Sequence, residues 1–235
     1  MRFDVVTLFP ELFAPFLASG VTRRAYEGPL QVRLWNPRDY ADGNYRRVDD
    51  RPFGGGPGMV MMAEPMARCL DAIRAHRAEE APAPAVLFSP LGDRLAHDVV
   101  EAWSASAGAV LVCGRYEGID QRFIDAYIDR QISLGDFVLS GGEIPAMALL
   151  DAVARLQPGV LNDEGSHQQD SFNPALDGLL DCPHYTRPES WRGQAVPATL
   201  MSGDHRRIDR WRHEQRLSLT SALRPDLLPP KKNGI

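Results

Sequence analysis

The sequence lacks the features of secreted, membrane-spanning and disulfide-stabilised proteins. Its three cysteines, Cys69, Cys113 and Cys182, are an odd number without a CxxC pair, which excludes a disulfide framework and a zinc site of the usual spacing. No signal peptide precedes the first strand-like residues, and no apolar run reaches the roughly 18 residues of a membrane helix. We therefore expect a reducing, cytoplasmic setting and no membrane partner.

Positive charge is also in short supply. The formal net charge of −5 excludes a globally basic nucleic-acid-binding protein, so any RNA contact must come from a local cluster. The phosphate-loop pattern and the dinucleotide GxGxxG unit are both absent, which argues against a nucleotide-dependent oxidoreductase. A hydrophobic content of 44% over 235 residues nevertheless supports at least one sizeable core.

Short apolar runs alternate with helix-like segments along the first two thirds of the chain. The segments expected to be strands are 3–9, 31–35, 85–88, 109–113 and 130–134. The segments expected to be helices are 95–103, 120–127 and two that start near Glu64 and Pro145. This alternation predicts an α/β layer with parallel strands. The segments without periodicity, expected to be an irregular loop and an interdomain linker, are 36–58 and 157–172.

Three glycine-bearing segments are candidates for ligand binding. Segment 51–59 has four glycines in five residues, which lets backbone amides approach a ligand, but an ordinary tight loop is an equal alternative. Segment 113–120 follows an apolar strand, where ligands of α/β proteins bind, yet a plain turn capped by Asp120 explains it equally well. In segment 133–145 a glycine pair accompanies Phe137 and Leu139, which favours a backbone-lined pocket for a flat adenine ring.

A basic cluster lies on a helix expected to begin at Ser202 or Asp204 and to run to about Leu217. Its arginines, interleaved with Trp211, are Arg206, Arg207, Arg210, Arg212 and Arg216. Guanidinium groups match phosphate geometry, so the cluster indicates RNA binding. The alternative is a solvated helix face, since nearby carboxylates lower the local charge. The chain then ends in Pro-Pro-Lys-Lys and is expected to fray.

Taken in order, these segments resemble the bacterial tRNA (guanine-N1)-methyltransferase family, within the SPOUT methyltransferases. The matching blocks are FDVVTLFPELF (3–13), DDRPFGGGPGMVM (49–61), CGRYEGIDQR (113–122), SLGDFVLSGGEIPAM (133–147), DSF (170–172) and GLLDCPHYTRP (178–188). The match runs to about Trp211, and the C-terminus is shorter than in many members. Several blocks in one fixed order are far more specific than any single glycine motif.

The resemblance implies a parallel-sheet SPOUT domain that ends in a trefoil knot, a small helical C-terminal domain, and an obligate homodimer with the active site at the subunit interface. The implied boundaries are 1–158 for the catalytic domain, 159–175 for the linker and 176–235 for the tRNA-binding domain. Knots are rare, and neither composition nor periodicity predicts one.

The resemblance also implies S-adenosylmethionine as methyl donor, held by loop backbone in the knot. The positions that match the donor site are Phe88, Ser89, Pro90, Gly114, Gly118, Leu134, Gly135, Asp136, Phe137, Val138, Leu139, Gly141, Gly142 and Pro145. By the same match Asp170 is the catalytic base and Arg155 assists it. From spacing alone, a solvated linker carboxylate is the better interpretation of Asp170.

The implied substrate is guanosine at tRNA position 37, next to the anticodon. Residues expected to contact the tRNA are Asp50, Glu117, Arg206, Arg207 and Arg210. Members of the family are associated with Mg²⁺, but the sequence shows no carboxylate cage, so the metal ligands stay unknown. Two alternatives stay open: a SPOUT methyltransferase acting on another RNA, and a non-catalytic tRNA-binding module.

Overall fold

The computed structural model describes residues 1–78, 80–162 and 165–229, and the chain divides between Leu161 and Asn162 into two compact units. This division lies within the linker expected from the sequence, residues 159–175. Residues 163 and 164 of the expected linker and the expected Pro-Pro-Lys-Lys tail lie outside the described residues, apart from Pro229.

A parallel sheet of five strands forms the centre of the first unit, in the order β2-β1-β6-β5-β7. Its strands are β1 (Arg2–Val6), β2 (Gln31–Trp35), β5 (Ala85–Arg94), β6 (Val110–Val112) and β7 (Arg130–Ser133). The predicted parallel α/β layer is thereby confirmed. The first strand ends at Val6 and not at Phe9, because the chain turns there and the Phe9 N–H donates to Thr7 Oγ1 at 3.0 Å.

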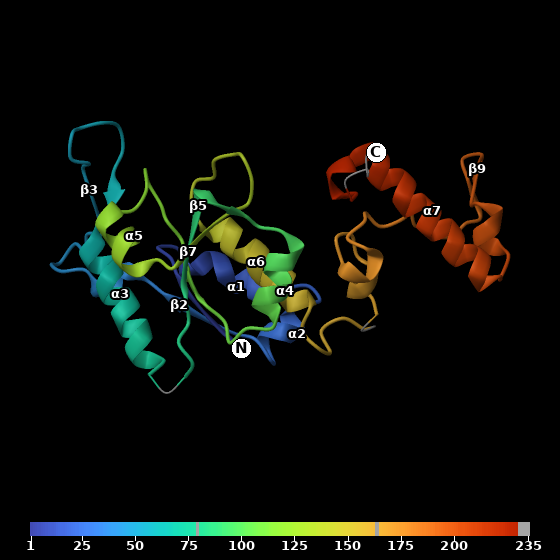
Figure 1. Ribbon diagram of the computed structural model, residues 1–235. Helices are drawn as coiled ribbons and strands as arrows, with labels where there is room; N and C mark the ends of the chain where they lie inside the picture. Colours follow the sequence, from blue (N-terminus) through green and yellow to red (C-terminus); the bar gives the residue numbers. More distant parts are fainter. Residues whose placement is uncertain (79, 163–164, 230–235) are drawn as a thin grey trace. The chain divides into compact units, whose positions relative to one another are not determined.

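Helices cover both faces of this sheet (Figure 1). On one face lie α3 (Ala63–His76) and α5 (Gln121–Tyr127). On the other lie α1 (Phe13–Leu17), α2 (Arg23–Tyr26), α4 (His97–Ser104) and α6 (Glu143–Arg155). The predicted buried face of α3 is confirmed, with Met66, Cys69 and Ile73 fully buried.

Strand β5, the third strand of this sheet in chain order, runs six residues further than predicted and is irregular. Both Phe88 and Asp93 pair with Ile132 of β7, so the residues between them bulge out of the ladder. Gly92 makes this possible, because a Cβ there would lie 2.4 Å from the carbonyl carbon of Gln131. The bulge therefore holds residues 89–92 beside the end of β7.

Segment 36–58 is less irregular than expected. It contains the 3₁₀ turn η2 (Pro37–Tyr40) and strand β3 (Asp49–Asp50), which pairs antiparallel with β4 (Val60–Met61). Two-residue strands carry too little alternation to be recognised from sequence.

A buried ion cluster lies around Asp4 of β1. Its carboxylate is fully buried and accepts hydrogen bonds from Arg2 Nη2 at 2.8 Å, Arg77 Nη1 at 2.7 Å and Trp35 Nε1 at 2.8 Å. Two guanidinium groups and an indole N–H thus compensate the desolvation of this carboxylate.

The second unit is built around one long helix, α7 (His205–Leu223). Asp204 caps it by accepting from the Arg207 N–H at 3.2 Å, and the helix continues past the predicted end near Leu217. The remaining regular segments are η3 (His167–Gln169), η4 (Pro174–Leu176), β8 (Ser190–Trp191), β9 (Gln194–Ala195), η5 (Ala198–Met201) and η6 (Pro225–Leu227). In the described ranges, we find no helical segment with the length and apolarity that a membrane crossing requires.

Candidate active site

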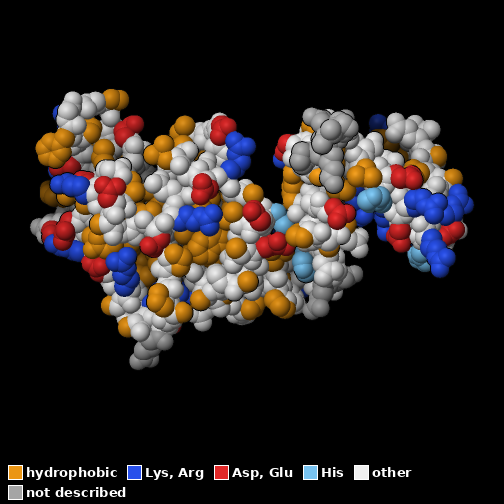
Figure 2. Space-filling model, viewed as in Figure 1, with side chains coloured by type: hydrophobic (Ala, Val, Ile, Leu, Met, Phe, Trp, Pro, Cys, Tyr) orange, Lys and Arg blue, Asp and Glu red, His pale blue; other side chains and the backbone are white. Residues whose placement is uncertain are grey.

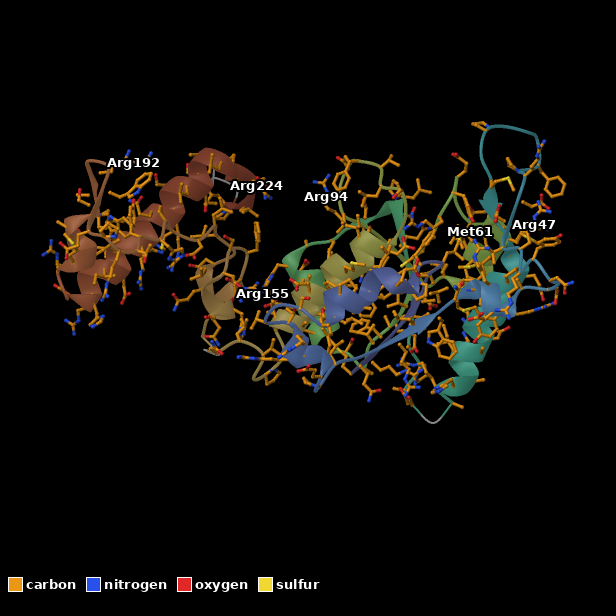
Figure 3. All side chains as sticks on the ribbon, turned by 180° about the vertical axis from the view of Figure 1, so that it is seen from behind. Arg47, Met61, Arg94, Arg155, Arg192 and Arg224 are labelled. Atoms are coloured by element: carbon orange, nitrogen blue, oxygen red, sulfur yellow. The ribbon has the colours of Figure 1, made fainter. Side chains whose placement is uncertain are left out.

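A cavity of about 500 Å³ lies at the bulge of β5 and at the carboxyl ends of β6 and β7. Its walls come from residues 87–91, 114–119, 131–135 and 137–142, with further contributions from Gln121, Ile124 and Pro145. Every residue matched to the donor site lines this cavity except Asp136, whose exposed carboxylate pairs with Arg94 Nη2 at 2.9 Å (Figure 3). The volume is that of a typical small-molecule site.

Two of the three glycine segments, 113–120 and 133–145, meet at the wall of this cavity. The Gly142 N–H donates to Gly114 O at 3.0 Å, so the loop before α6 lies against the loop after β6. A Cβ on Gly142 would lie 2.6 Å from Cys113 Cα, a separation closed to real side chains. Glycine is therefore required at position 142 by the close approach of two backbones.

The remaining glycine segment docks against the same loop. The Glu117 N–H donates to Met59 O at 2.9 Å, and the Met61 N–H donates to Gly118 O at 2.9 Å (Met61 is labelled in Figure 3). Gly58 has φ +74°, and a Cβ on it would lie 2.5 Å from Glu117 Cγ. Glu117 thus lies on the cavity wall where segments 51–59 and 113–120 meet.

Asp50, the other expected substrate contact in this unit, lies on β3 outside the cavity lining. Its Oδ1 atom accepts from Arg47 Nη2 and from the Arg51 N–H, both at 2.7 Å (Arg47 is labelled in Figure 3). The carboxylate is exposed and shapes the start of the glycine loop.

Arg115 and Glu143 form an ion pair at the cavity that the sequence reasoning did not single out. The Arg115 Nε atom lies 2.9 Å from Glu143 Oε2, and Glu143 Oε1 accepts from Thr7 Oγ1 at 2.8 Å. Burial, together with the negative charge of Glu143, raises the pKa of the Cys113 thiol well above its usual value. Cys113 therefore stays a neutral thiol and is no nucleophile.

The expected catalytic pair is divided between the two units. Arg155 is the last residue of α6 in the first unit and is half-buried (Figure 3). Asp170 follows η3 in the second unit and is also half-buried. Two residues later Phe172 has φ +72°, a conformation that costs an ordinary residue free energy and occurs often at functional sites.

The second unit presents its arginines on α7. Arg206, Arg207 and Arg210 are exposed, and Figure 2 shows arginine side chains gathered on one part of this unit. Nearer the other end of the helix, Arg216 Nε lies 3.4 Å from Asp181 Oδ1. Burial of Asp181 opposes its ionisation, but hydrogen bonds from His184, the Cys182 N–H and Arg216 outweigh that cost and lower its pKa.

A resident metal site has no support in the described ranges. No group of three or more His, Cys, Asp or Glu side chains in residues 1–78, 80–162 and 165–229 is placed to hold a metal ion.

The contacts among Thr7, Arg115 and Glu143 were not predicted from the sequence, because they join residues far apart in the chain. Arg115 and Glu143 stand inside the quoted blocks, and each directly follows a glycine, so a charge beside a glycine was an available signal. Thr7 lies 136 residues from Glu143 and carries no local signal for that contact.

Comparison with known proteins agrees with these features. The family model described as tRNA (Guanine-1)-methyltransferase TrmD matches residues 1–230. The protein named tRNA (guanine-N(1)-)-methyltransferase from Paracidovorax citrulli (strain AAC00-1) is 77% identical over 231 residues, which cover 97% of this chain and 91% of that protein. The protein of the same name from Polaromonas sp. (strain JS666 / ATCC BAA-500) is 77% identical over 231 residues, covering 97% and 89%. The one from Herminiimonas arsenicoxydans is 55% identical over 231 residues, covering 97% and 92%.

Matches of this extent confirm the resemblance drawn from the sequence blocks. They cover both units, and so include the cavity, the segment with Asp170 and the arginine-bearing helix. The chain belongs to the tRNA (guanine-1)-methyltransferase family.

Proposed function

We propose that this chain transfers the methyl group of S-adenosylmethionine to N1 of guanosine at tRNA position 37, next to the anticodon. The observation that carries the proposal is the cavity at the bulge of β5 and the carboxyl ends of β6 and β7, in a chain whose relatives are named tRNA (guanine-N(1)-)-methyltransferase. The bound donor supplies an electrophilic methyl group on a sulfonium. Glycine-rich loops that expose backbone N–H and C=O groups are suited to a flat adenine ring.

Asp170 is the proposed general base. Guanine N1 carries a proton at neutral pH, so its attack on a methyl group requires a carboxylate that accepts this proton. Negative charge then spreads towards O6, and the permanently charged guanidinium of Arg155 is suited to stabilise it. The family match supports both roles, since it covers both residues: Asp170 stands in the matching block 170–172, and Arg155 stands on the helix before the linker.

The proposed active site is shared by two subunits of a homodimer, with the linker of one copy reaching the donor cavity of the other. Exposed apolar side chains beside the cavity support this arrangement. Leu91 is 86% exposed, Val138 85% and Ile144 57%. Large apolar side chains this exposed near a cavity are consistent with a surface that another chain covers.

The remaining assignments concern the knot, the tRNA and the metal. The trefoil knot is proposed from the family alone. The proposed tRNA contacts are Asp50 and Glu117 in the first unit and the α7 arginines in the second, because exposed guanidinium groups pair readily with phosphates. Glu117 is the candidate contact for the Mg²⁺ associated with the family, and no step above runs through that ion.

The experiment measures methyl transfer from labelled S-adenosylmethionine to unmodified tRNA that carries guanosine at position 37, with the adenosine variant alongside. The expected result is N1-methylguanosine with the first tRNA and no label with the second. The Asp170→Asn variant should fold, bind the donor and lose about 10²–10⁴-fold in turnover, the usual contribution of a general base. Near-normal turnover in this variant would remove Asp170 from the mechanism.

The same experiment distinguishes the alternatives. Transfer to a different RNA, with none to this tRNA, would identify a SPOUT methyltransferase with another substrate. Tight binding of donor and tRNA without transfer would identify a non-catalytic tRNA-binding module. Absence of donor binding would show that the cavity is assigned wrongly.

A further inference from the structure

A buried ion pair joins the two glycine loops behind the proposed donor cavity. Glu143, the first residue of α6, has a side chain only 2% exposed. Its carboxylate accepts a hydrogen bond from the Thr7 hydroxyl and lies 2.9 Å from Arg115 Nε. A carboxylate this deeply buried is strongly disfavoured unless a cation or hydrogen-bond donors compensate it. Thr7 provides a hydrogen bond to Oε1, and Arg115 provides the opposite charge beside Oε2, without the alignment of a hydrogen bond.

The guanidinium of Arg115 is held from several sides. Its Cζ atom lies 4.5 Å from the centre of the Phe9 ring, and Nη1 donates to Ser140 O at 3.2 Å. The chain at Gly141 passes so close that a Cβ there would lie within 2.6 Å of Arg115 Cδ and Glu143 Oε2. The cation is therefore fixed against the backbone of residues 140 and 141.

This contact reaches both walls of the cavity. Arg115 belongs to the loop after β6, and Ser140 and Gly141 belong to the loop before α6, and all three line the cavity. Besides the pair, the hydrogen bond from Gly142 N–H to Gly114 O joins the same two loops. The ion pair and this hydrogen bond are thus two contacts that join the walls at this point.

We propose that Glu143 is a positioning residue for the methyl donor. By holding Arg115 against the Ser140–Gly141 backbone, it fixes the spacing of the two loops between which the donor binds. Glu143 touches no substrate in this role and acts through Arg115. The inference rests on the proposed location of the donor in this cavity and goes beyond it by naming what keeps the cavity in shape.

The test compares two isosteric changes of buried carboxylates in the full-length protein. Glu143→Gln keeps the size and an acceptor for Thr7 but removes the charge that holds Arg115. Asp4→Asn is the matched control, because Asp4 is equally buried against arginines, but its partners Arg2 and Arg77 do not line the cavity, whereas Arg115 does. Urea denaturation gives the stability of each variant, and calorimetric titration with S-adenosylmethionine gives its dissociation constant.

Both variants are expected to be less stable, but only Glu143→Gln should weaken donor binding. The expected loss of affinity is about tenfold, which is within the usual range of coupling between two residues in contact, here Glu143 and Arg115. The KM for the donor should rise by the same factor, and kcat should change by less than about threefold, because the catalytic pair is untouched. A destabilised Glu143→Gln protein with an unchanged dissociation constant would make the pair purely structural and overturn the inference.

A second comparison tests whether Glu143 acts through Arg115. In an Arg115→Met background, Glu143→Gln should change donor affinity by less than about twofold, since the contact is already lost. If the effects of Glu143→Gln and Arg115→Met on donor affinity add fully in the double variant, this would contradict the proposal that Glu143 acts through Arg115. If Glu143→Gln fails to fold, Arg115→Lys replaces it, because lysine keeps the charge but loses the planar fork that meets Ser140 O. Normal donor affinity in Arg115→Lys would also overturn the inference.

The outcomes separate this inference from the proposed function. Wild-type protein that fails to bind S-adenosylmethionine contradicts the location of the donor. Wild-type protein that binds the donor, together with a Glu143→Gln variant that binds it equally well, contradicts only the positioning role.

Discussion

Gly142→Ala is the substitution whose effect the structure defines most sharply. Gly142 has φ −80° and ψ −3°, which alanine adopts without strain, so the effect is one of packing. The new Cβ would lie 2.6 Å from Cys113 Cα and 3.2 Å from Gly114 N, and both atoms belong to backbone that cannot move independently. The loops must separate, which also lengthens the hydrogen bond from Gly142 N–H to Gly114 O.

The magnitude follows from three contributions. Overpacking costs about 1–3 kcal/mol. The lost hydrogen bond costs about 0.5–1.5 kcal/mol. Replacing glycine by alanine lowers the conformational entropy of the unfolded chain, which stabilises the folded protein by about 0.4–1 kcal/mol. We therefore expect the free energy of unfolding to fall by about 2 kcal/mol, and donor affinity to fall with it, because both loops line the cavity.

Urea denaturation and calorimetric titration with S-adenosylmethionine measure the two quantities. Gly114→Ala is the stability control at the same junction, since its Cβ would meet only the Ile119 and Leu87 side chains at 3.5 Å and beyond. That variant should unfold within about 0.5 kcal/mol of wild type. A Gly142→Ala protein of wild-type stability and donor affinity would refute the argument that the two backbones are locked together.

Three further predictions concern the tRNA, the second unit and the dimer. Replacing Arg206 and Arg210 together by glutamine should weaken tRNA binding and lower the slope of log affinity against log salt by about 1–2, measured by titration at several salt concentrations; an unchanged slope would remove α7 from the RNA surface. The lowered pKa of Asp181 stabilises the folded chain above the ordinary Asp pKa, and this stability is lost as pH falls through the lowered value. Thermal unfolding of Asp181→Asn should therefore depend less on pH below about 5 than that of wild type, and parallel curves would contradict the assignment. Mixing Asp170→Asn with Gly141→Ala, each inactive alone, should restore about a quarter of the wild-type activity if the site is shared by two subunits, and none if each subunit holds a whole site.

Local patterns were sufficient for the elements that carry strong periodicity or a capping residue. The apolar spacing of α3 predicted its buried face, and Asp120 and Asp204 begin their helices as capping residues should. The helices α1 and α2, with five and four residues, were not predicted, because their segments complete at most about one and a half helical turns. The pairing of β3 with β4 was missed for the same reason.

The candidate site shows the same division between local and long-range information. Glycine segments 51–59 and 113–120 could each have been ordinary turns, and their own residues could not decide the matter. The structure joins them through backbone hydrogen bonds at Met59 and Met61 and places part of the second on the cavity wall. The roles of Asp170 and Arg155 stay predictions, to be tested by the experiments above.

The sequence by itself determined the parallel α/β layer and membership of the tRNA (guanine-1)-methyltransferase family, because alternating periodicity and ordered motif blocks are properties of the chain alone. Only the tertiary structure decided that Thr7, Arg115 and Glu143 meet behind one cavity. The physical reason is that parallel strands end at the same edge of a sheet, whatever their separation along the chain. Residues 136 positions apart therefore come within hydrogen-bonding distance there, and no local pattern records that contact.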